Sequence, residues 1–267
     1  MEPVAATYKP SLLRLNKYVV YLDYFKEYIA CKDFKSLGAS LKYVFTHKLP
    51  TKAYEAKSEM GTFLIRKETN DFQFINLAYE RKVKKYISYI RNQFDVFIDA
   101  GACIGEYSIW LGKLGKKCIA IEPVNFEAIQ KNVALNKLED KVQIFACGLG
   151  NKMERVHFNI PKGVTSSSYM DKESGGELNV TIETLDNLYP QFNLSPTDRI
   201  LMKLDVEGME VEALEGAAEF IKKHDKISFI YEHFKSDNYR NDKALLKLAN
   251  FTFKDIDSVN RLAIKVN

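Results

Sequence analysis

Two acids and two glycines in residues 95–123 have a spacing that suits ligand binding. Asp99 closes a short apolar run, Gly101 and Gly105 follow it, and Glu122 ends the next apolar run. Glycine lets the backbone turn tightly and approach a ligand, because no Cβ stands in the way. An acid at the end of the second strand of such a unit can bind both hydroxyls of a ribose. These residues therefore predict a site for a nucleoside-containing ligand.

A second group of polar residues follows two later apolar runs. Asp205 and Glu207 come after the run at 199–204, and Glu232 and His233 end the run at 226–233. Open α/β sheets bind ligands at the carboxyl ends of their strands, where a carboxylate or an imidazole can act as a general base. Simpler roles stay open, since Glu207 can cap the following helix and His233 can be a structural residue.

The same carboxylates raise the question of a metal. Asp205, Glu207 and Glu232 could converge on a divalent cation, and Mg²⁺ prefers oxygen ligands of this kind. Carboxylates also occur at strand ends without any metal. We therefore leave a divalent metal open and predict no metal site.

The elements that must position these residues form an α/β pattern. Buried strands are expected at 96–98, 118–121, 142–147, 199–205 and 226–233, with a final strand pair at 251–256 and 262–266. Helices are expected at 126–136 and 241–250, and another is expected to end near Lys222. Two more strands, at 155–160 and 178–184, flank a loop at 162–176 that is rich in small and polar residues. We interpret this loop as a substrate-side lid, with a hairpin tip as the alternative.

Residues 1–58 read differently from the remainder of the chain. Apolar residues recur at helical steps over 11–31, on a face formed by Leu12, Leu15, Val19, Leu22, Tyr18, Phe25 and Ile29. Ser36 is expected to cap a second helix that runs through His47, with Leu37, Leu41, Val44 and Phe45 on one face. Both helices fit a cap, lid or dimer surface, and a weak peripheral membrane contact is the alternative.

The stretch between this extension and the first glycine is expected to add two smaller elements. G-T-F-L-I-R-K and F-Q-F-I-N-L, within residues 59–77, predict a short β-hairpin. Residues 79–93 predict a basic helix with Val83, Ile87 and Ile90 facing inward. Its charges suit a solvated face, and no aromatic platform or basic stripe supports nucleic-acid binding.

Composition is that of an ordinary globular protein. The 267 residues carry a net charge of +4, and residues 1–58 hold ten Lys/Arg against five Asp/Glu, which leaves −1 for the remainder. Cys31, Cys103, Cys118 and Cys147 form no C-x-x-C pair, so they indicate reduced thiols. No apolar run is long enough to span a bilayer, and no secretory signal opens the chain. We therefore expect a cytoplasmic protein.

Four segments together resemble the FkbM family of methyltransferases. They read F-I-D-A-G-A-C-I-G-E-Y-S, I-E-P-V-N-F-E-A-I-Q-K-N-V-A-L-N, I-E-T-L-D-N-L and M-K-L-D-V-E-G-M-E-V-E-A-L-E-G-A. The resemblance covers residues from about 59 to the C-terminus, so the chain divides into a helical extension (1–58) and an FkbM-like domain (59–267). It implies a class I methyltransferase fold of the α/β class. Such a fold is Rossmann-like and mostly parallel, with an antiparallel last strand and helices on both faces.

The resemblance also implies a cofactor, S-adenosylmethionine, and its site. Members of the family transfer its methyl group to oxygen on sugars, macrolides and related metabolites. On the matched positions, Glu122 would hold the ribose, and Pro123, Asn125, Cys147 and Gly148 would border the adenine. The methionine half would be lined by Asp99, Gly101, Ala102, Gly105, Glu106, Tyr107 and Ser108. Cys103 departs from the small or polar residues common at its position.

For the reaction, an alcohol acceptor must lose a proton as the methyl group arrives. We expect Asp205 to face the methyl group and either His233 or Glu232 to take the proton. The acceptor would be a sugar, a glycan or another small metabolite. Three alternatives remain: a scaffold that keeps the fold and the cofactor, a nicotinamide-dependent oxidoreductase, and methylation of protein or nucleic acid. A homodimer also stays open.

Overall fold

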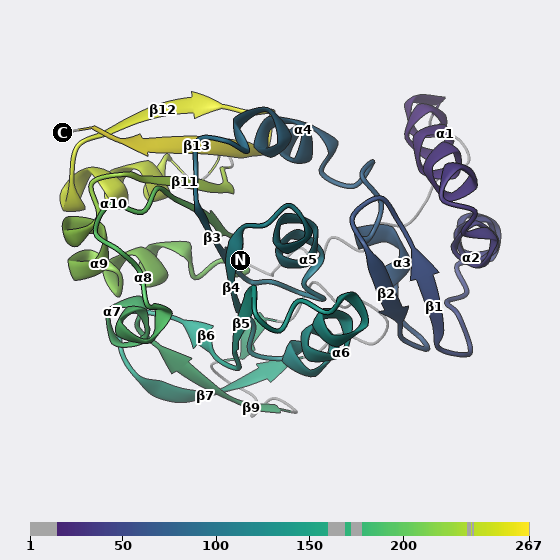
Figure 1. Cartoon of the computed structure of the whole chain (residues 1–267), viewed down its shortest axis with the longest axis horizontal. Helices are drawn as coiled ribbons and strands as arrows, with labels where there is room; N and C mark the ends of the chain where they lie inside the picture. Colours follow the sequence, from purple (N-terminus) through teal and green to yellow (C-terminus); the bar gives the residue numbers. More distant parts are fainter. Residues whose placement is uncertain (1–14, 160–168, 172–177, 234–235, 237, 267) are drawn as a thin grey trace.

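The computed structural model of the chain describes residues 15–159, 169–171, 178–233, 236 and 238–266. At its centre lies a seven-stranded sheet in the order β12-β13-β11-β10-β3-β4-β5 (Figure 1). Its strands are β3 (Val96–Ala100), β4 (Lys117–Ile121), β5 (Val142–Phe145), β10 (Ile200–Leu204), β11 (Ile227–Glu232), β12 (Phe251–Asp255) and β13 (Asn260–Lys265). Strands β5, β4, β3, β10 and β11 run parallel to one another, and β13 pairs antiparallel with both β11 and β12. The expected class I methyltransferase fold is confirmed.

The sheet is buried on both faces because its strands are apolar almost without interruption. In β3, Phe97 points into one hydrophobic cluster, while Val96 and Ile98 point into the other. This alternation is the two-residue period of a strand. Each face therefore needs its own layer of helices.

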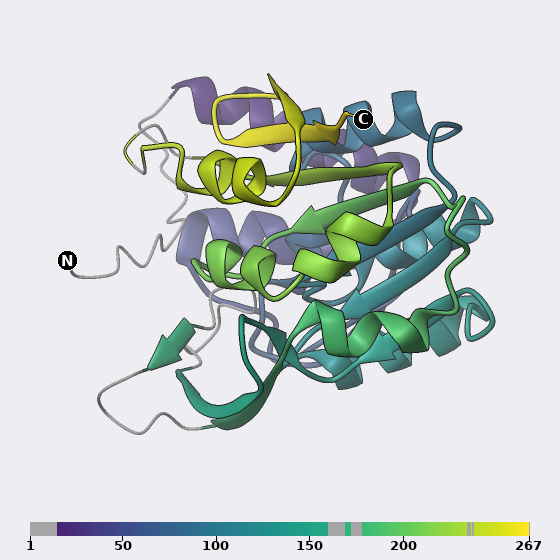
Figure 2. The same cartoon turned by 90° about the vertical axis from the view of Figure 1, so that its left-hand side faces the viewer.

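Those helices form two layers (Figure 1). One layer contains α4 (Arg81–Ile90), α5 (Glu106–Lys113) and α6 (Phe126–Asn136), and Val83, Ile87 and Ile90 face inward as expected. The other contains α7 (Leu185–Leu188), α8 (Glu210–Glu215), α9 (Ala218–Lys223) and α10 (Arg240–Leu248), with a 3₁₀ turn at Tyr189–Phe192 (Figure 2).

The helix that was expected to run unbroken to Lys222 is instead α8 followed by α9. The break falls at Gly216, where a Cβ would lie 2.0 Å from the carbonyl oxygen of Gly150. At Gly216 the backbone therefore packs directly against the backbone of Gly150, at a place where only glycine fits.

A second sheet flanks the domain. Its order is β6-β9-β7-β8, with β6 (Gly148–Leu149), β7 (Glu154–Asn159), β8 (Tyr169–Asp171) and β9 (Leu178–Glu183). β7 and β9 are the two expected strands, paired antiparallel. Most of the loop interpreted as a lid, at 162–176, lies outside the described residues, and the part described within it is strand β8.

The N-terminal part contains α1 (Leu15–Ala30), α2 (Phe34–Thr46), β1 (Tyr54–Lys57), β2 (Thr62–Ile65) and α3 (Asp71–Phe74). The predicted hairpin partner F-Q-F-I-N-L is wrong, because its first residues form α3 and β2 pairs with β1 instead. That pairing crosses the predicted boundary between residues 58 and 59. The division into 1–58 and 59–267 stays a prediction.

The expected faces of the two N-terminal helices are also wrong, except that Val44 is buried as expected. On α1, Tyr21 and Tyr28 are buried while Val19, Leu22 and Ile29 are exposed. Tyrosine can pack its ring and still place its hydroxyl on a polar partner, as Tyr28 does by donating to the Phe72 carbonyl at 2.7 Å. Leu12 lies outside the described residues.

On α2 the buried positions include two serines. Ser36, Ser40 and Val44 face inward, whereas Leu41 and Phe45 are exposed. The cap is Asp33, whose side chain accepts a hydrogen bond from the Ser36 backbone N–H at 3.1 Å, so Ser36 is not the cap. No helix among the described residues is long and apolar enough to cross a membrane.

Two asparagines of α6 attach the β1–β2 hairpin to the domain. Asn132, fully buried, accepts from the Leu64 backbone N–H at 2.8 Å and donates to the Ile104 carbonyl at 2.9 Å. Asn136 accepts from the Thr62 N–H at 2.9 Å and donates to the Thr62 carbonyl at 2.6 Å. These side chains satisfy backbone groups of β2 that would otherwise lack a partner on that edge.

We expect Asn132→Ala to lower the free energy of unfolding by about 2 kcal/mol or more, since it leaves two backbone groups unpaired. Urea unfolding measures this loss. Lys131→Ala on the exposed side of the same helix is the control and is expected to stay within about 0.5 kcal/mol of the unmodified chain. Equal effects of the two substitutions would contradict the role given to Asn132.

Candidate functional site

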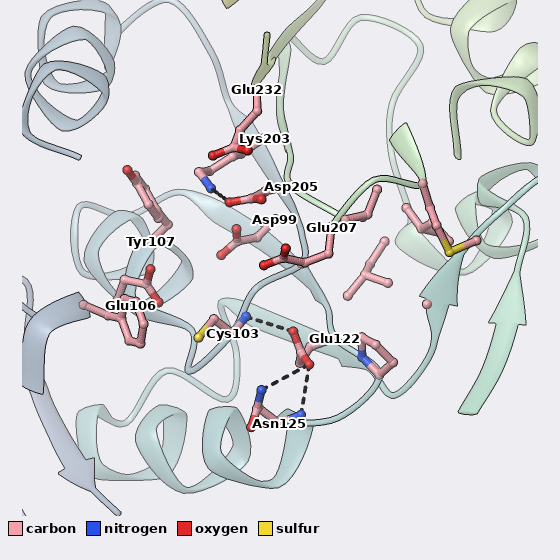
Figure 3. Close-up of a pocket in the computed structure, with 18 of the residues that line it drawn as sticks. Asp99, Cys103, Glu106, Tyr107, Glu122, Asn125, Lys203, Asp205, Glu207 and Glu232 are labelled. Carbon is pink, nitrogen blue, oxygen red and sulfur yellow. Dashed lines mark hydrogen bonds and ion pairs between the residues drawn. The ribbon is translucent and has the colours of Figure 1, made fainter. Parts of the chain in front are cut away.

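A cavity of about 310 Å³ lies at the carboxyl ends of the parallel strands (Figure 3). β3, β4, β10 and β11 each bring an acid to its wall: Asp99, Glu122, Asp205 and Glu232. The volume is within the range of small-molecule sites, and the position is where open α/β sheets bind ligands.

The glycine loop after β3 forms the floor of this cavity. Gly101 has φ +82°, and a Cβ there would lie 1.7 Å from the backbone oxygen of Asp205. The Asp205 backbone N–H in turn donates to the Ala100 carbonyl at 3.0 Å. Gly105, with φ +81°, precedes α5 and leaves no room for a Cβ beside Ile129. The loop is thus held in close backbone contact with the end of β10.

Glu122 is buried at the end of β4 and is held by backbone donors (Figure 3). Its carboxylate accepts from the N–H groups of Cys103, Val124 and Asn125 at 2.9–3.0 Å. Burial raises the pKa of Glu122, and these donors oppose the rise. The Asn125 side-chain amide also donates to Oε1, at 3.5 Å. The other oxygen, Oε2, accepts only the Cys103 N–H within the described part of the chain. Since a carboxylate oxygen offers about two acceptor sites, one site on Oε2 remains for a ligand hydroxyl.

A chain of contacts fixes the residues around Glu122 from the hairpin side. Arg66, just after β2, donates to the Asn125 side-chain oxygen at 2.8 Å and forms a two-pronged pair with Asp71. Two-pronged pairs of this kind hold both groups in one orientation. The N-terminal hairpin therefore supports the wall of the cavity that carries Glu122.

Two further buried acids lie beside the glycine loop. Asp99 accepts from the Ser108 hydroxyl at 2.8 Å, and burial raises its pKa to about 6. Burial also raises the pKa of Glu106 and lowers that of the buried Lys84, and the attraction between these two groups opposes both shifts. One oxygen of Glu106 has no hydrogen-bond partner. The site thus holds a buried acceptor that a ligand donor could satisfy.

Lys203 organises the opposite side of the cavity. Its ammonium lies 2.6 Å from an Asp205 oxygen and 3.7 Å from a Glu80 oxygen. Tyr107 donates to the same Glu80 oxygen at 2.8 Å, and its ring centre is 5.3 Å from the Lys203 ammonium. Burial lowers the pKa of Lys203, but its acidic neighbours outweigh that effect and the net shift is upward. Lys203 therefore stays charged and fixes Asp205 in place.

Glu207 and Glu232 line the same side of the cavity as Lys203. Within the described ranges, neither forms an ion pair with a lysine or an arginine. Desolvation raises the pKa of Glu232 to about 7, and repulsion from Asp205 adds to it. The pKa of Glu207 is raised by desolvation and then by Asp205 and Glu232, although water screens part of this because the side chain is exposed at the cavity mouth. Within the described part of the chain, neither carboxylate accepts a hydrogen bond.

The comparisons with known proteins agree with this geometry. Residues 99–259 match the family described as the methyltransferase FkbM domain, which covers more than half of the chain. The chain belongs to the FkbM methyltransferase family. It is also similar to methyltransferase sdnD of Sordaria araneosa, with 29% identity over 155 residues, 46% of this chain and 60% of that protein. The chain therefore spans less than two thirds of the length of this curated relative.

Solved structures of other methyltransferases are similar as well. One is the methyltransferase FkbM from Methylobacillus flagellatus KT, with 20% identity and a TM-score of 0.46, over 64% of this chain and 44% of that chain. Another is the precorrin-6y C5,15-methyltransferase of Geobacter metallireducens GS-15, with 16% identity and a TM-score of 0.42, over 70% of this chain and 88% of that chain.

Most residues that the sequence predicted for the site line the cavity. They are Asp99, Gly101, Glu106, Tyr107, Glu122, Pro123, Asn125, Cys147, Gly148, Asp205 and Glu232. Ala102, Gly105 and Ser108 are not among its described lining residues; Ser108 instead holds Asp99 from behind. Their roles toward a cofactor stay predictions.

His233 is placed elsewhere. It is not among the described residues that line the cavity, and its ring lies 4.7 Å from that of Tyr239. Its backbone N–H donates to the Val259 carbonyl, just before β13. Residues alternate faces along β11, so the side chain that follows Glu232 points away from it. Of the two candidate bases, the geometry therefore favours Glu232.

The FkbM motifs alone miss part of the wall. Phe74, Tyr79 and Glu80 lie before the matched region yet line the cavity. Lys203 lies within the M-K-L-D segment and also lines the cavity, although it was not predicted as a site residue. A signal existed for Lys203, because a lysine inside an apolar strand must find an acidic partner. The sequence contains no comparable signal for Glu80, which looks like any surface acid at the start of a basic helix.

A metal receives no support from the described residues. Asp205, Glu207 and Glu232 all reach the cavity, but no group of three or more His, Cys, Asp or Glu side chains in the described ranges could hold an ion.

Substituting Gly101 tests the close contact under the cavity. Gly101→Ala is expected to lower the free energy of unfolding by about 3 kcal/mol or more, because the clash with Asp205 adds to the strain of a positive φ. Urea unfolding measures the loss.

Gly115 is the matched control. It has the same φ of +82°, but nothing lies within 4 Å of a Cβ built there. Gly115→Ala should therefore show the strain alone, about 1 kcal/mol. Similar losses in both variants would show that the contact with Asp205 matters little.

Proposed function

We propose that this chain transfers a methyl group from S-adenosylmethionine to a hydroxyl of a small metabolite such as a sugar. The observation that carries the proposal is the charge of the cavity. Seven carboxylates line it, whereas Lys203 is the single lysine or arginine among the described lining residues. S-adenosylmethionine carries a sulfonium and an ammonium group, so its cationic half suits these walls.

The residues present fit this cofactor. The remaining acceptor site of Glu122 suits a ribose hydroxyl, and the unpartnered oxygen of Glu106 suits an ammonium donor. The apolar Ile121, Leu149 and Ile182 beside Gly148 and Pro123 offer a surface for the adenine. When bound, the cofactor supplies a methyl group on a good leaving group, so the chain's residues mainly position and desolvate the acceptor.

On the acceptor side we assign Glu232 as the general base. A base whose pKa is close to the working pH combines the right protonation state with useful strength, and that of Glu232 is about 7. Asp205, held by Lys203, would orient the acceptor hydroxyl toward the methyl group. Glu80 would position Lys203 through its ion pair.

The same charge argues against other readings. A nicotinamide cofactor would bring an anionic pyrophosphate to a wall of acids with one lysine, which like-charge repulsion disfavours. An anionic acceptor, including nucleic acid, meets the same obstacle. A neutral molecule with several hydroxyls can donate to these carboxylates, which supports a sugar or glycan.

The four free thiols support a reducing compartment such as the cytoplasm.

Glu122→Gln tests the cofactor site without knowledge of the acceptor. We expect isothermal titration calorimetry to show S-adenosylhomocysteine binding at least about 30-fold weaker, because a charged acceptor is lost. Glu127→Gln, on the exposed side of the first turn of α6, should bind as the unmodified chain does. Tight binding of NAD instead of S-adenosylhomocysteine would overturn the proposal.

The pH dependence tests the base. Because Glu232 acts in its ionised form, kcat/KM for S-adenosylmethionine, which reports on the cavity before the cofactor binds, should rise as pH increases through about 7 and level off above it. Glu232→Gln should lower kcat by about 10²–10⁴-fold and remove this rise. Methyl transfer from labelled S-adenosylmethionine, followed by mass spectrometry of the product, provides the measurement.

His233→Ala is the companion variant for the pH experiment. Since its ring packs on Tyr239 away from the cavity, it should keep the pH profile of the unmodified chain. Loss of the profile in His233→Ala with its retention in Glu232→Gln would reverse the assignment.

A further inference from the structure

The outward faces of α1 and α2 are unusually apolar. On α1 they carry Val19, Leu22 and Ile29, which are 63%, 56% and 55% exposed. On α2 they carry Phe34 and Phe45, which are 66% and 65% exposed, together with Leu41. We call these six residues the outer N-terminal surface. Large apolar side chains gathered on exposed helix faces mark an interaction site.

The two helices turn these side chains away from the protein. Both lie at the edge of the molecule, beyond the β1–β2 hairpin (Figure 1). Their inner faces are already in use: Tyr28 donates to the Phe72 carbonyl, and the rings of Tyr43 and Phe72 lie 6.0 Å apart. At 3.6 residues per turn, Val19 lies opposite the buried Tyr21 and Tyr28, and the other exposed apolar positions lie roughly 90–140° around their helix from its buried face.

Charge is distributed in the same inside–outside manner. All six lysines of residues 18–52 are exposed, and none has an ion-pair partner within the described ranges: Lys26, Lys32, Lys35, Lys42, Lys48 and Lys52.

The three acids of residues 18–52 all face the protein. Asp23 pairs with Arg81, Glu27 accepts from the Leu77 backbone N–H at 2.6 Å, and Asp33 caps α2. The sequence mixes lysines with acids, but the fold separates them. The outside is therefore both apolar and cationic.

We propose that the outer N-terminal surface binds the face of an anionic lipid bilayer. Exposed Phe and Leu side chains flanked by unpaired lysines suit an interface of headgroups and acyl chains. Each lysine near an anionic surface adds to the attraction. A second copy fits less well, because a two-fold pairing would bring the lysines of both copies together. The proposal concerns binding alone and does not depend on the proposed function.

Vesicle co-sedimentation tests it with the full chain. The probes are vesicles of phosphatidylcholine alone and vesicles in which about a third of the lipid is phosphatidylserine. We expect sedimentation with the anionic vesicles only, and release at high salt. No binding to anionic vesicles, or equal binding to both kinds, would overturn the proposal.

Two double variants locate the surface. Phe34→Ser with Phe45→Ser removes apolar area, and Lys35→Glu with Lys42→Glu reverses two charges. Each pair should lower the partition coefficient about tenfold or more. All four side chains are exposed, so the variants should keep the thermal unfolding midpoint of the unmodified chain.

Helix α10 supplies matched controls, since it lies on the other side of the sheet from α1 and α2 (Figure 1). Leu246→Ser and the pair Lys243→Glu with Lys247→Glu change exposed residues of the same kinds and should bind vesicles normally. Equal loss in the controls would show a non-specific effect and overturn the proposal. Light scattering that reveals a dimer lost in the α2 variants, without vesicle binding, would assign the surface to a second copy.

Discussion

Holding many carboxylates around one small cavity is the constraint on which the arrangement of this chain depends. An unpaired charge taken out of water costs several kcal/mol, so each acid needs donors, a cation or a proton. Glu122 has backbone N–H groups, Asp99 has Ser108, and Asp205 has Lys203. Glu232 has neither a hydrogen-bond donor nor an ion-pair partner within the described part of the chain, so desolvation and then repulsion from Asp205 raise its pKa to about 7.

The donors come from parts of the chain far apart in sequence. The loop after β3 carries Cys103, whose backbone N–H donates to Glu122. The same loop runs against the carbonyl of Asp205 at Gly101, so only glycine fits there. Lys84 reaches the site from α4, before the region that matches the family, and opposes the charge of Glu106 from behind. Segments outside the FkbM match thus belong to the electrostatic environment of the site.

The sequence predicted the sheet well because β3, β4, β10 and β11 are short, mainly apolar runs with an acid at or next to their carboxyl ends. It predicted α1 and α2 as helices but not their buried faces, since Tyr28 and Ser36 are buried with their hydroxyls on the Phe72 carbonyl and on the Tyr54 hydroxyl. It missed α3 because F-Q-F-I-N-L alternates like a strand. Motif residues of the cavity were found, whereas Glu80 was not, because only the fold brings it to Lys203 and Tyr107.

Charge also links the cofactor side of the proposed site to its acceptor side. A cation bound near Glu232 favours its ionised form and lowers its pKa, whereas in the unliganded cavity desolvation and then repulsion from Asp205 favour the proton. By linkage, ionisation of Glu232 strengthens binding of that cation to the same degree. If the ligand is the proposed sulfonium donor, the base becomes fully ionised at neutral pH only when the methyl group is present. The unpaired carboxylate is then a means of coupling donor binding to acceptor activation, which a neutral side chain at this position could not provide.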